Sequence, residues 1–279
     1  MKTRISDLKK MKKNNEIISM LTAYDFYSGK LIEAAGIDAI LVGDSLGMVM
    51  QGNDNTLPVT LDEMIYHTKM VARGIKETLL VTDLPFMTFQ KGPDQALTSA
   101  GKILKKTSAD AVKVEGGTRI VPQIEAMVNS GIPVMGHLGL TPQSVNQFGG
   151  FSVQGQNKEK ALELVEDALA LEEAGVFSIV LETVPKELAE IITDKLSVPT
   201  IGIGAGANCD GQILVLHDLL GVDEEFTPNF VRKYVNLNEI IIKGVKEYIQ
   251  DVKNKNFPAA EESYSIKTSV LKDIEKELD

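Results

Sequence analysis

Residues 39–45 read AILVGDS, an apolar run that leads straight into a glycine, an aspartate and a serine. A strand that is apolar at nearly every position is buried on both faces, as parallel strands covered by helices are. The pattern recurs along the chain, and each run is followed by a stretch with helical features. Eight runs share it: Ile17–Ala23, Ala39–Gly43, Leu79–Thr82, Ala111–Val114, Pro133–Gly136, Phe177–Leu181, Pro199–Ile203 and Gln212–Leu216. They predict a closed (β/α)8 barrel of parallel strands, with an open doubly wound sheet as the alternative.

The segments between these runs carry the signals that begin and end helices. The stretch Thr60–Glu63 forms a capping box, and Gly36 and Gly175 are placed to end two helices. The glycine-rich segment Phe148–Gln156 is expected to be a loop over one face of the barrel. Further on, Leu237–Val252 has an apolar stripe at helical spacing. We expect one barrel domain over residues 1–258 and a C-terminal extension over 259–279.

The overall charge and the cysteine content narrow the possible partners and compartments. The 279-residue chain has a formal net charge of −10, and an acidic protein repels a phosphate backbone, so nucleic acid is not an expected partner. No apolar run reaches the roughly 18 residues that a membrane-spanning helix needs, so we expect no membrane contact. The single cysteine, Cys209, cannot form an internal disulfide, and a reducing cytoplasm is the expected location.

Polar residues cluster where five successive predicted strands end. They are Asp44 and Ser45 after the second strand, Asp83 after the third, Lys113 and Glu115 at the end of the fourth, His137 after the fifth and Glu182 after the sixth. A single carboxylate in such a place is usually solvated or caps the next helix. In a barrel, however, all carboxyl ends of the strands open on one mouth, where barrel active sites lie. The pattern therefore predicts one shared site.

The residue types at this mouth indicate the chemistry. Four carboxylates, one imidazole and no thiolate favour a hard cation such as Mg2+ over zinc. A 2-keto acid can offer such an ion a carboxylate oxygen and a keto oxygen, and the ion then stabilises the charge that develops when an adjacent proton leaves. Lys113 and His137 could add positive charge or hydrogen bonds. Glu182 is the candidate general base, because it lies further round the barrel from Asp44 and Asp83.

The same residues lie in stretches that closely resemble the ketopantoate hydroxymethyltransferase family. The resemblance covers roughly Ser6 to Pro258. Its motifs are LTAYD (Leu21–Asp25), LVGDSLGMVMQGNDNTLPVTLDEMIYHT (Leu41–Thr68), DLPFM (Asp83–Met87), VKVEGG (Val112–Gly117), GHLGLTPQSVNQFGGFSVQG (Gly136–Gly155), ALEEAG, LETVP (Leu181–Pro185) and IGIGAGANCDGQILVLHD (Ile201–Asp218).

The resemblance implies a TIM barrel that uses Mg2+ and 5,10-methylene-tetrahydrofolate. Members transfer a hydroxymethyl group to 3-methyl-2-oxobutanoate, which gives 2-dehydropantoate in the first committed step of pantothenate synthesis, and they assemble as homo-oligomers, often decamers. By resemblance, the metal site contains Asp44, Asp83 and Glu115. The keto acid contacts Asp44, Ser45, Asp83 and Lys113, with His137 beside it. Glu182 is the proton acceptor, through a Mg2+-stabilised enolate.

Two other functions remain open at this point. One is a carbon–carbon lyase or mutase of the phosphoenolpyruvate mutase and isocitrate lyase type, which would also use a Mg2+-stabilised enolate. It would be expected to carry a differently placed nucleophile or a catalytic cysteine loop, and Cys209 beside the seventh run argues weakly against it. The other is a non-catalytic, metabolite-binding barrel, which would be expected to show gaps in the carboxylate set.

Overall fold

The computed structural model describes residues 2–148, 152–223 and 227–279 of the chain. The chain forms two compact units, one of Met1–Leu219 with Thr227–Arg232 and one of Leu220–Phe226 with Lys233–Asp279. The domain boundary expected after Pro258 stays a prediction. Within the loop expected at Phe148–Gln156, residues 149–151 lie outside the described residues.

The first unit is a closed barrel of eight parallel strands, in which β8 pairs with β1. Each of the eight predicted apolar runs overlaps one strand, so the predicted (β/α)8 barrel is confirmed and the open sheet is excluded. The strands are β1 Ile18–Thr22, β2 Ala39–Val42, β3 Leu79–Asp83, β4 Ala111–Glu115, β5 Val134–Gly139, β6 Ser178–Glu182, β7 Thr200–Ile203 and β8 Gly211–Leu214.

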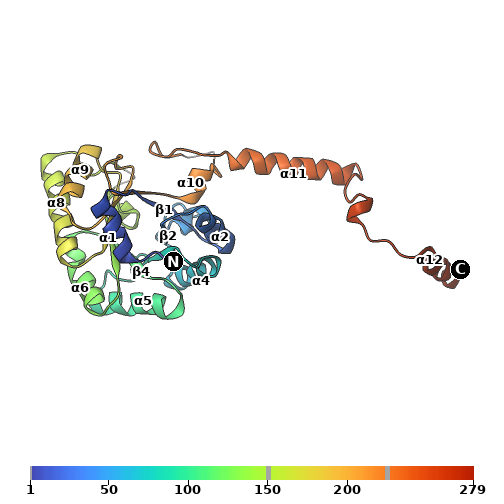
Figure 1. Cartoon of the computed structure of the whole chain (residues 1–279), viewed down its shortest axis with the longest axis horizontal. Helices are drawn as coiled ribbons and strands as arrows, with labels where there is room; N and C mark the ends of the chain where they lie inside the picture. Colours follow the sequence, from blue (N-terminus) through green and yellow to red (C-terminus); the bar gives the residue numbers. More distant parts are fainter. Residues whose placement is uncertain (1, 149–151, 224–226) are drawn as a thin grey trace. The chain divides into compact units, whose positions relative to one another are not determined.

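Helices follow the strands and surround them (Figure 1). The helices of this unit are α1 Ile5–Asn14, α2 Phe26–Ala34, α3 Leu46–Val49, α4 Leu61–Gly74, α5 Pro93–Lys106, α6 Val121–Asn129, α7 Val145–Phe148, α8 Lys158–Glu173 and α9 Lys186–Lys195, with short 3-10 turns η1 Thr118–Ile120 and η2 Pro142–Ser144. The short helix α10 Leu216–Leu220 ends on the first residue of the second unit. The expected capping box begins α4, where Thr60 accepts from the backbone of Glu63. One connection departs from the alternation, because β7 leads to β8 through residues 204–210 without a helix.

Alternate strand residues fill the barrel interior. Met20, Leu41, Val81 and Met135 belong to one buried apolar cluster there, and α1 adds Leu8 to it. Complete burial of such a side chain stabilises the fold by about 1.5–3 kcal/mol. Neighbouring positions on β4, β5 and β6, among them Val112, Val134 and Ile179, belong to a second cluster, which they form with the surrounding helices. The two-residue period of a strand thus separates the interior of the barrel from its helical cover.

The helix α1 covers the amino-terminal end of the barrel. Lys12 Nζ lies 2.8 Å from Asp210, just before β8, and Lys2 Nζ lies 2.5 Å from Asp110, just before β4. The same aspartates also accept hydrogen bonds from the backbone of the strand before them, since Thr200 N donates to Asp210 and Leu80 N to Asp110, at 2.8 and 2.9 Å. These bonds help to fix the register, and the register decides which side chains meet at the opposite end.

The second unit contains α11 Leu237–Lys253, the 3-10 turn η3 Ala260–Glu262 and α12 Thr268–Leu278. The helix α11 confirms the amphipathic helix predicted over Leu237–Val252, and its side chains Ile240, Ile241, Val245 and Ile249 are 56, 50, 51 and 43% exposed. Among the residues that the structure describes, no helix is long and apolar enough to cross a bilayer.

Candidate active site at the carboxyl ends of the strands

Five of the predicted site residues meet in the polar end of the barrel. Asp83 is paired in register with Lys113, and Glu115 with His137, so two levels of polar side chains lie above the apolar interior. Asp44 lies two residues after the end of β2. These five residues are only 2–6% exposed. A buried polar cluster of this size is costly unless its charges and hydrogen bonds satisfy one another.

Asp83 connects the second strand to the fourth. Its Oδ2 accepts a hydrogen bond from the backbone N–H of Asp44 at 3.1 Å, and its Oδ1 lies 2.5 Å from Lys113 Nζ. The same ammonium lies 3.8 Å from Glu115 Oε1. Burial opposes the charged form of Lys113, but Asp83, Glu115 and Asp44 outweigh it and raise its pKa. Lys113 is therefore a fixed cation at neutral pH.

His137 connects the fourth strand to the sixth. Its Nδ1 lies 3.2 Å from Glu115 Oε1, and its Nε2 lies 3.2 Å from Glu182 Oε2. Burial and the charge of Lys113 lower the pKa of His137, whereas Glu115 and Glu182 raise it, with a net value of about 9. Burial likewise raises the pKa of Glu115, but His137 and Lys113 outweigh burial and lower it. The imidazolium form, with Nδ1 donating to Glu115 and Nε2 facing Glu182, is thus favoured at neutral pH.

Glu182 differs from its partners in accessibility. It is the last residue of β6, and its side chain is 17% exposed, whereas the side chains of His137 and Glu115 are 3% exposed. The residue after it, Thr183, has a φ of 53°, a left-handed conformation that is unusual for a β-branched residue. Glu182 is therefore the predicted site carboxylate that solvent, and hence a substrate, reaches most readily.

Asp44 is the group whose charge is least well balanced. Burial first, and then the neighbouring Asp83 and Glu115, hold the pKa of Asp44 well above its usual value. The pKa of Asp83 is raised as well, chiefly by burial. Four carboxyl groups here face two cations, Lys113 and His137, so two negative charges are in excess when all are ionised. A proton or another cation has to compensate for them.

Ser45, the remaining predicted residue, lies next to this cluster and contacts a tyrosine. The hydroxyl groups of Ser45 and Tyr24 are 2.8 Å apart, and Tyr24 is fully buried. Burial raises the pKa of Tyr24, so its hydroxyl stays protonated. The backbone oxygen of Tyr24 lies 2.6 Å from His67 Nδ1. The loop after β1 therefore supports Ser45, a contact that the sequence analysis did not predict.

Gln143, in the turn η2 after β5, was also missed. Its backbone N–H donates to Glu115 Oε2 at 3.0 Å, and its side-chain Nε2 donates to Asp44 Oδ2 at 2.8 Å. The only sequence signal was a polar residue directly after Thr141-Pro142, which fits an ordinary helix cap equally well. Gln143 is 5% exposed, so this amide belongs to the buried cluster.

The donor set suits a hard divalent cation in its chemistry. Oxygen ligands predominate, although the buried Asp83 Oδ1 already has the Lys113 ammonium as its ion-pair partner. Within residues 2–148, 152–223 and 227–279, however, no three His, Cys, Asp or Glu side chains are arranged to hold an ion together. Lys113 Nζ contacts two of the three predicted carboxylates instead. The residues thus fit an ion held directly by one or two carboxylates and otherwise by water, as Mg2+ often is.

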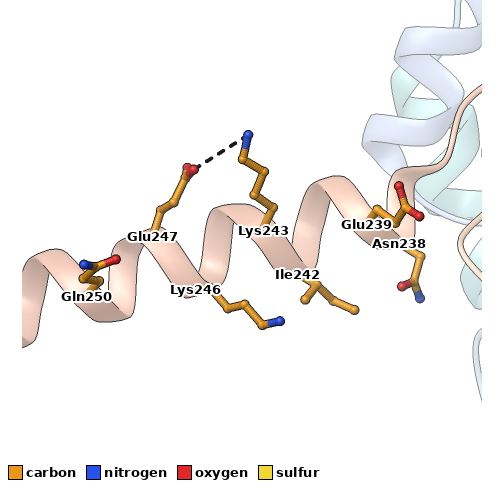
Figure 2. A pocket seen from close by; sticks show the side chains of 7 residues that line it. All are labelled: Asn238, Glu239, Ile242, Lys243, Lys246, Glu247 and Gln250. Carbon is orange, nitrogen blue, oxygen red and sulfur yellow. Dashed lines mark ion pairs between the residues drawn. The ribbon is translucent and has the colours of Figure 1, made fainter.

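The hollow drawn in Figure 2 is a different feature. Its lining comes from α11 alone, between Asn238 and Gln250, and it contains the ion pair of Lys243 and Glu247 at 3.9 Å. A shallow surface on one exposed helix has no converging catalytic groups. It is not a candidate for the active site.

The barrel has relatives among solved enzyme structures. One is a phosphonopyruvate hydrolase, solved in complex with oxalate and Mg++, which has a TM-score of 0.62 and 12% sequence identity and covers 100% of this chain and 97% of its own. At that identity the similarity shows the fold alone. The similarity therefore gives no support to a lyase or mutase activity of this chain, although the lyases and mutases considered as the alternative share this type of barrel.

Sequence relatives define the class. A 3-methyl-2-oxobutanoate hydroxymethyltransferase of Clostridium novyi (strain NT) is 53% identical over 271 residues, which cover 97% of this chain and 98% of the relative. An enzyme of the same name from Dehalococcoides mccartyi (strain ATCC BAA-2266 / KCTC 15142 / 195) is 51% identical over 276 residues and covers 99% of this chain and 98% of its own. The chain is thus an enzyme, a one-carbon transferase of the hydroxymethyltransferase type, and the non-catalytic alternative is excluded.

The family itself follows from the full-length match. The sequence model of ketopantoate hydroxymethyltransferase matches residues 2–260. The chain belongs to this family, and the resemblance in its motifs is confirmed.

Proposed function

We propose that this enzyme transfers a hydroxymethyl group from 5,10-methylene-tetrahydrofolate to 3-methyl-2-oxobutanoate and forms 2-dehydropantoate, the first step of pantothenate biosynthesis. The names of its relatives support the keto acid as substrate. The single observation that carries the chemistry is the chain of contacts from Glu115 through His137 to Glu182. These contacts support Glu182 as an accessible base at the edge of a buried, charged cluster.

Asp44 and Asp83 are the proposed direct holders of Mg2+, and Glu115 is proposed to act through water. The excess of negative charge and the raised pKa values of Asp44 and Asp83 support this assignment, because a divalent cation would compensate for the charge without a proton. Bound there, Mg2+ would supply Lewis-acid polarisation of the keto oxygen, which makes the adjacent C–H bond more acidic.

Glu182 is the proposed acceptor of the C3 proton of the keto acid. Glu182 faces His137 Nε2 through Oε2 at 3.2 Å and keeps Oε1 for a proton. The imidazolium faces the carboxylate of Glu182 and favours one orientation of it. After the proton has moved, the same positive charge stabilises the negative charge that forms on the substrate.

Lys113, Ser45 and His137 are proposed to bind the keto acid together with Asp44 and Asp83. The ammonium of Lys113 stays charged, so it can attract the substrate carboxylate or keto oxygen. Ser45 is held through Tyr24. Polar groups whose positions are fixed before the substrate arrives need little reorganisation during the reaction.

The proposed net reaction balances with one water. The C3–H bond of the keto acid breaks and its proton passes to Glu182. A new bond forms between C3 and the methylene carbon. The bonds from that carbon to the two folate nitrogens break, and water supplies the hydroxyl group. The proton held by Glu182 and the second proton of the water pass to the two nitrogens, which leaves tetrahydrofolate and 2-dehydropantoate. A keto acid without a C3 proton is therefore not a substrate.

The enzyme is further proposed to form a homo-oligomer, a decamer, and to be located in the cytoplasm. The resemblance in the motifs supports the assembly, and so does the apolar stripe Ile240, Ile241, Val245 and Ile249, which is exposed on the single chain. Light scattering after size-exclusion chromatography tests the assembly. A monomer at micromolar concentration would contradict it.

Isotope exchange tests the proton transfer separately from the folate step. The enzyme with Mg2+ and 3-methyl-2-oxobutanoate in D2O should replace the C3 proton by deuterium, measured by proton NMR, in the absence of folate. Addition of 5,10-methylene-tetrahydrofolate should then give 2-dehydropantoate. If no exchange occurs with Mg2+, Mn2+ or Co2+ at neutral pH, the proposed mechanism is wrong.

A further inference from the structure

The amide of Gln143 reaches the polar cluster from the turn η2, outside the ring of strand ends. Gln143 is buried, and four hydrogen bonds, three of its amide and one of its backbone N–H, connect it to three other segments of the chain. They run to Asp44 after β2, to Leu84 and Gln90 after β3, and to Glu115 at the end of β4. Such a residue can fix the distance between carboxylates that belong to different strands.

The orientation of this amide follows from its partners. Nε2 donates to the backbone oxygen of Leu84 at 2.9 Å as well as to Asp44 Oδ2, and a carbonyl oxygen can only accept. Oε1 accepts from Gln90 Nε2 at 3.0 Å. Gln90 is itself held, because its Oε1 accepts from the backbone N–H of Phe89 at 3.4 Å. A flipped Gln143 would direct Oε1 at a carboxylate and a carbonyl, so one orientation is favoured.

Gln143 therefore presents two donors to the cluster and no charge. The side-chain donor at Asp44 and the backbone donor at Glu115 both favour the ionised carboxylates. A lysine in the same place would add a positive charge and repel a metal ion. A glutamate would lose the donor. A neutral, oriented amide stabilises the anionic ligands and leaves their charge available to a cation.

We propose that Gln143, oriented by Gln90, is the positioning residue that presets Asp44 and Glu115 for divalent-cation binding. The inference rests on the metal site proposed above. Groups that hydrogen-bond to ligating carboxylates typically change metal affinity by about 10- to 100-fold when they are removed. The effect of Gln143 is expected on the affinity for the ion itself, before any substrate binds.

The test is a Mn2+ titration of the full-length protein without keto acid, followed by calorimetry or by electron paramagnetic resonance of free Mn2+. Gln143→Met keeps the length of the side chain and the backbone donor to Glu115, but removes the donor to Asp44. Its Kd should rise by about 10-fold or more. Gln90→Met should give a smaller rise, because the amide of Gln143 then loses only the partner that orients it.

Gln212→Met is the matched control. The amide of Gln212 also donates to a backbone oxygen, that of Gly206 at 2.9 Å, but outside this cluster. The Kd of Gln212→Met for Mn2+ should equal that of the parent. Thermal unfolding of all variants separates the two possible roles, because a merely structural Gln143 would lower Tm and leave Kd unchanged. Unchanged Kd values for folded Gln143→Met, or for Gln90→Met if the former does not fold, would overturn the inference. A parent protein that binds no Mn2+ would refute the metal site as well.

Discussion

His137 Nε2 lies 3.2 Å from Glu182 Oε2, and the opposite nitrogen of the same ring lies 3.2 Å from Glu115 Oε1. Two carboxylates on one imidazole favour its protonated form, in which both nitrogens donate. One of these carboxylates is deeply buried and the other is partly exposed. The imidazolium thus links the orientation of Glu182, the accessible base, to that of the buried Glu115.

The first prediction concerns this base. Glu182→Gln should lower the rate of C3 deuterium exchange by at least about 100-fold, because an amide cannot accept the proton. Binding of 3-methyl-2-oxobutanoate, measured by calorimetry, should stay nearly intact, since the amide has the size of the carboxylate and its oxygen can face His137 Nε2. The control is Glu187→Gln, at a side chain that is 72% exposed. Equal exchange rates in Glu182→Gln and the parent would exclude Glu182 as the base.

The second prediction concerns pH. The pKa of His137 is raised from 6.5 to about 9 in the folded protein. Protonated His137 therefore adds roughly 3 kcal/mol to the free energy of unfolding. This contribution is fully present below about pH 6.5 and is lost as the pH rises through about 9. Urea unfolding in EDTA at pH 6.5 and pH 9.5 should show the decrease in the parent. In His137→Gln most of this decrease should be absent, and a variant with the slope of the parent would contradict the pKa shift.

The sequence predicted the fold well because each strand carries its own local signal. A run such as Ala39–Val42 is buried on both faces, so its residues are apolar wherever the register places them. Asp83, Glu115 and Glu182 could be assigned to one end of the barrel because each comes last in its strand. The helix expected after each strand is absent between β7 and β8, because only seven residues separate these two strands.

The contacts inside the cluster could not be predicted in the same way. Whether Lys113 pairs with Asp83 or reaches Glu115 depends on side-chain conformations across neighbouring strands, and local sequence does not contain this information. Gln143 reaches Asp44 over a sequence separation of 99 residues. Its local environment, after a threonine and a proline, looks like the start of a helix. The types of residue at the site were predictable, and their partners were not.

The third prediction concerns the proposed metal site. Asp83→Asn removes one negative charge from a carboxylate that lies 2.5 Å from Lys113 Nζ. The Mg2+ concentration for half-maximal exchange should rise by about 10-fold or more, because an amide oxygen is a weaker ligand for a hard cation. Asp194→Asn, at an exposed position of α9, should behave as the parent does. An unchanged Mg2+ titration for Asp83→Asn would remove Asp83 from the metal site.

The fourth prediction compares two glycines of similar conformation but different surroundings. Gly131 and Gly139 have φ values of 82° and 91°, in the region that other residues rarely adopt. A Cβ on Gly131 would meet nothing within 4 Å, whereas a Cβ on Gly139 would lie too close to the backbone oxygen of Glu182 and 2.7 Å from Val184 Cγ2. Gly131→Ala should therefore cost only the conformational strain, about 1–2 kcal/mol of unfolding free energy.

Gly139→Ala should cost several-fold more in urea unfolding, because β5 and β6 must separate where they pair Gly139 with Glu182. Since the backbone of Glu182 would have to move, the deuterium exchange rate of the folded fraction should fall as well. In Gly131→Ala that rate should match the parent. Equal losses of stability in the two variants would show that the close approach of Gly139 to Glu182 does not constrain the base. A lower stability of Gly139→Ala with an unchanged exchange rate would show that the position of Glu182 tolerates the displacement of its strand.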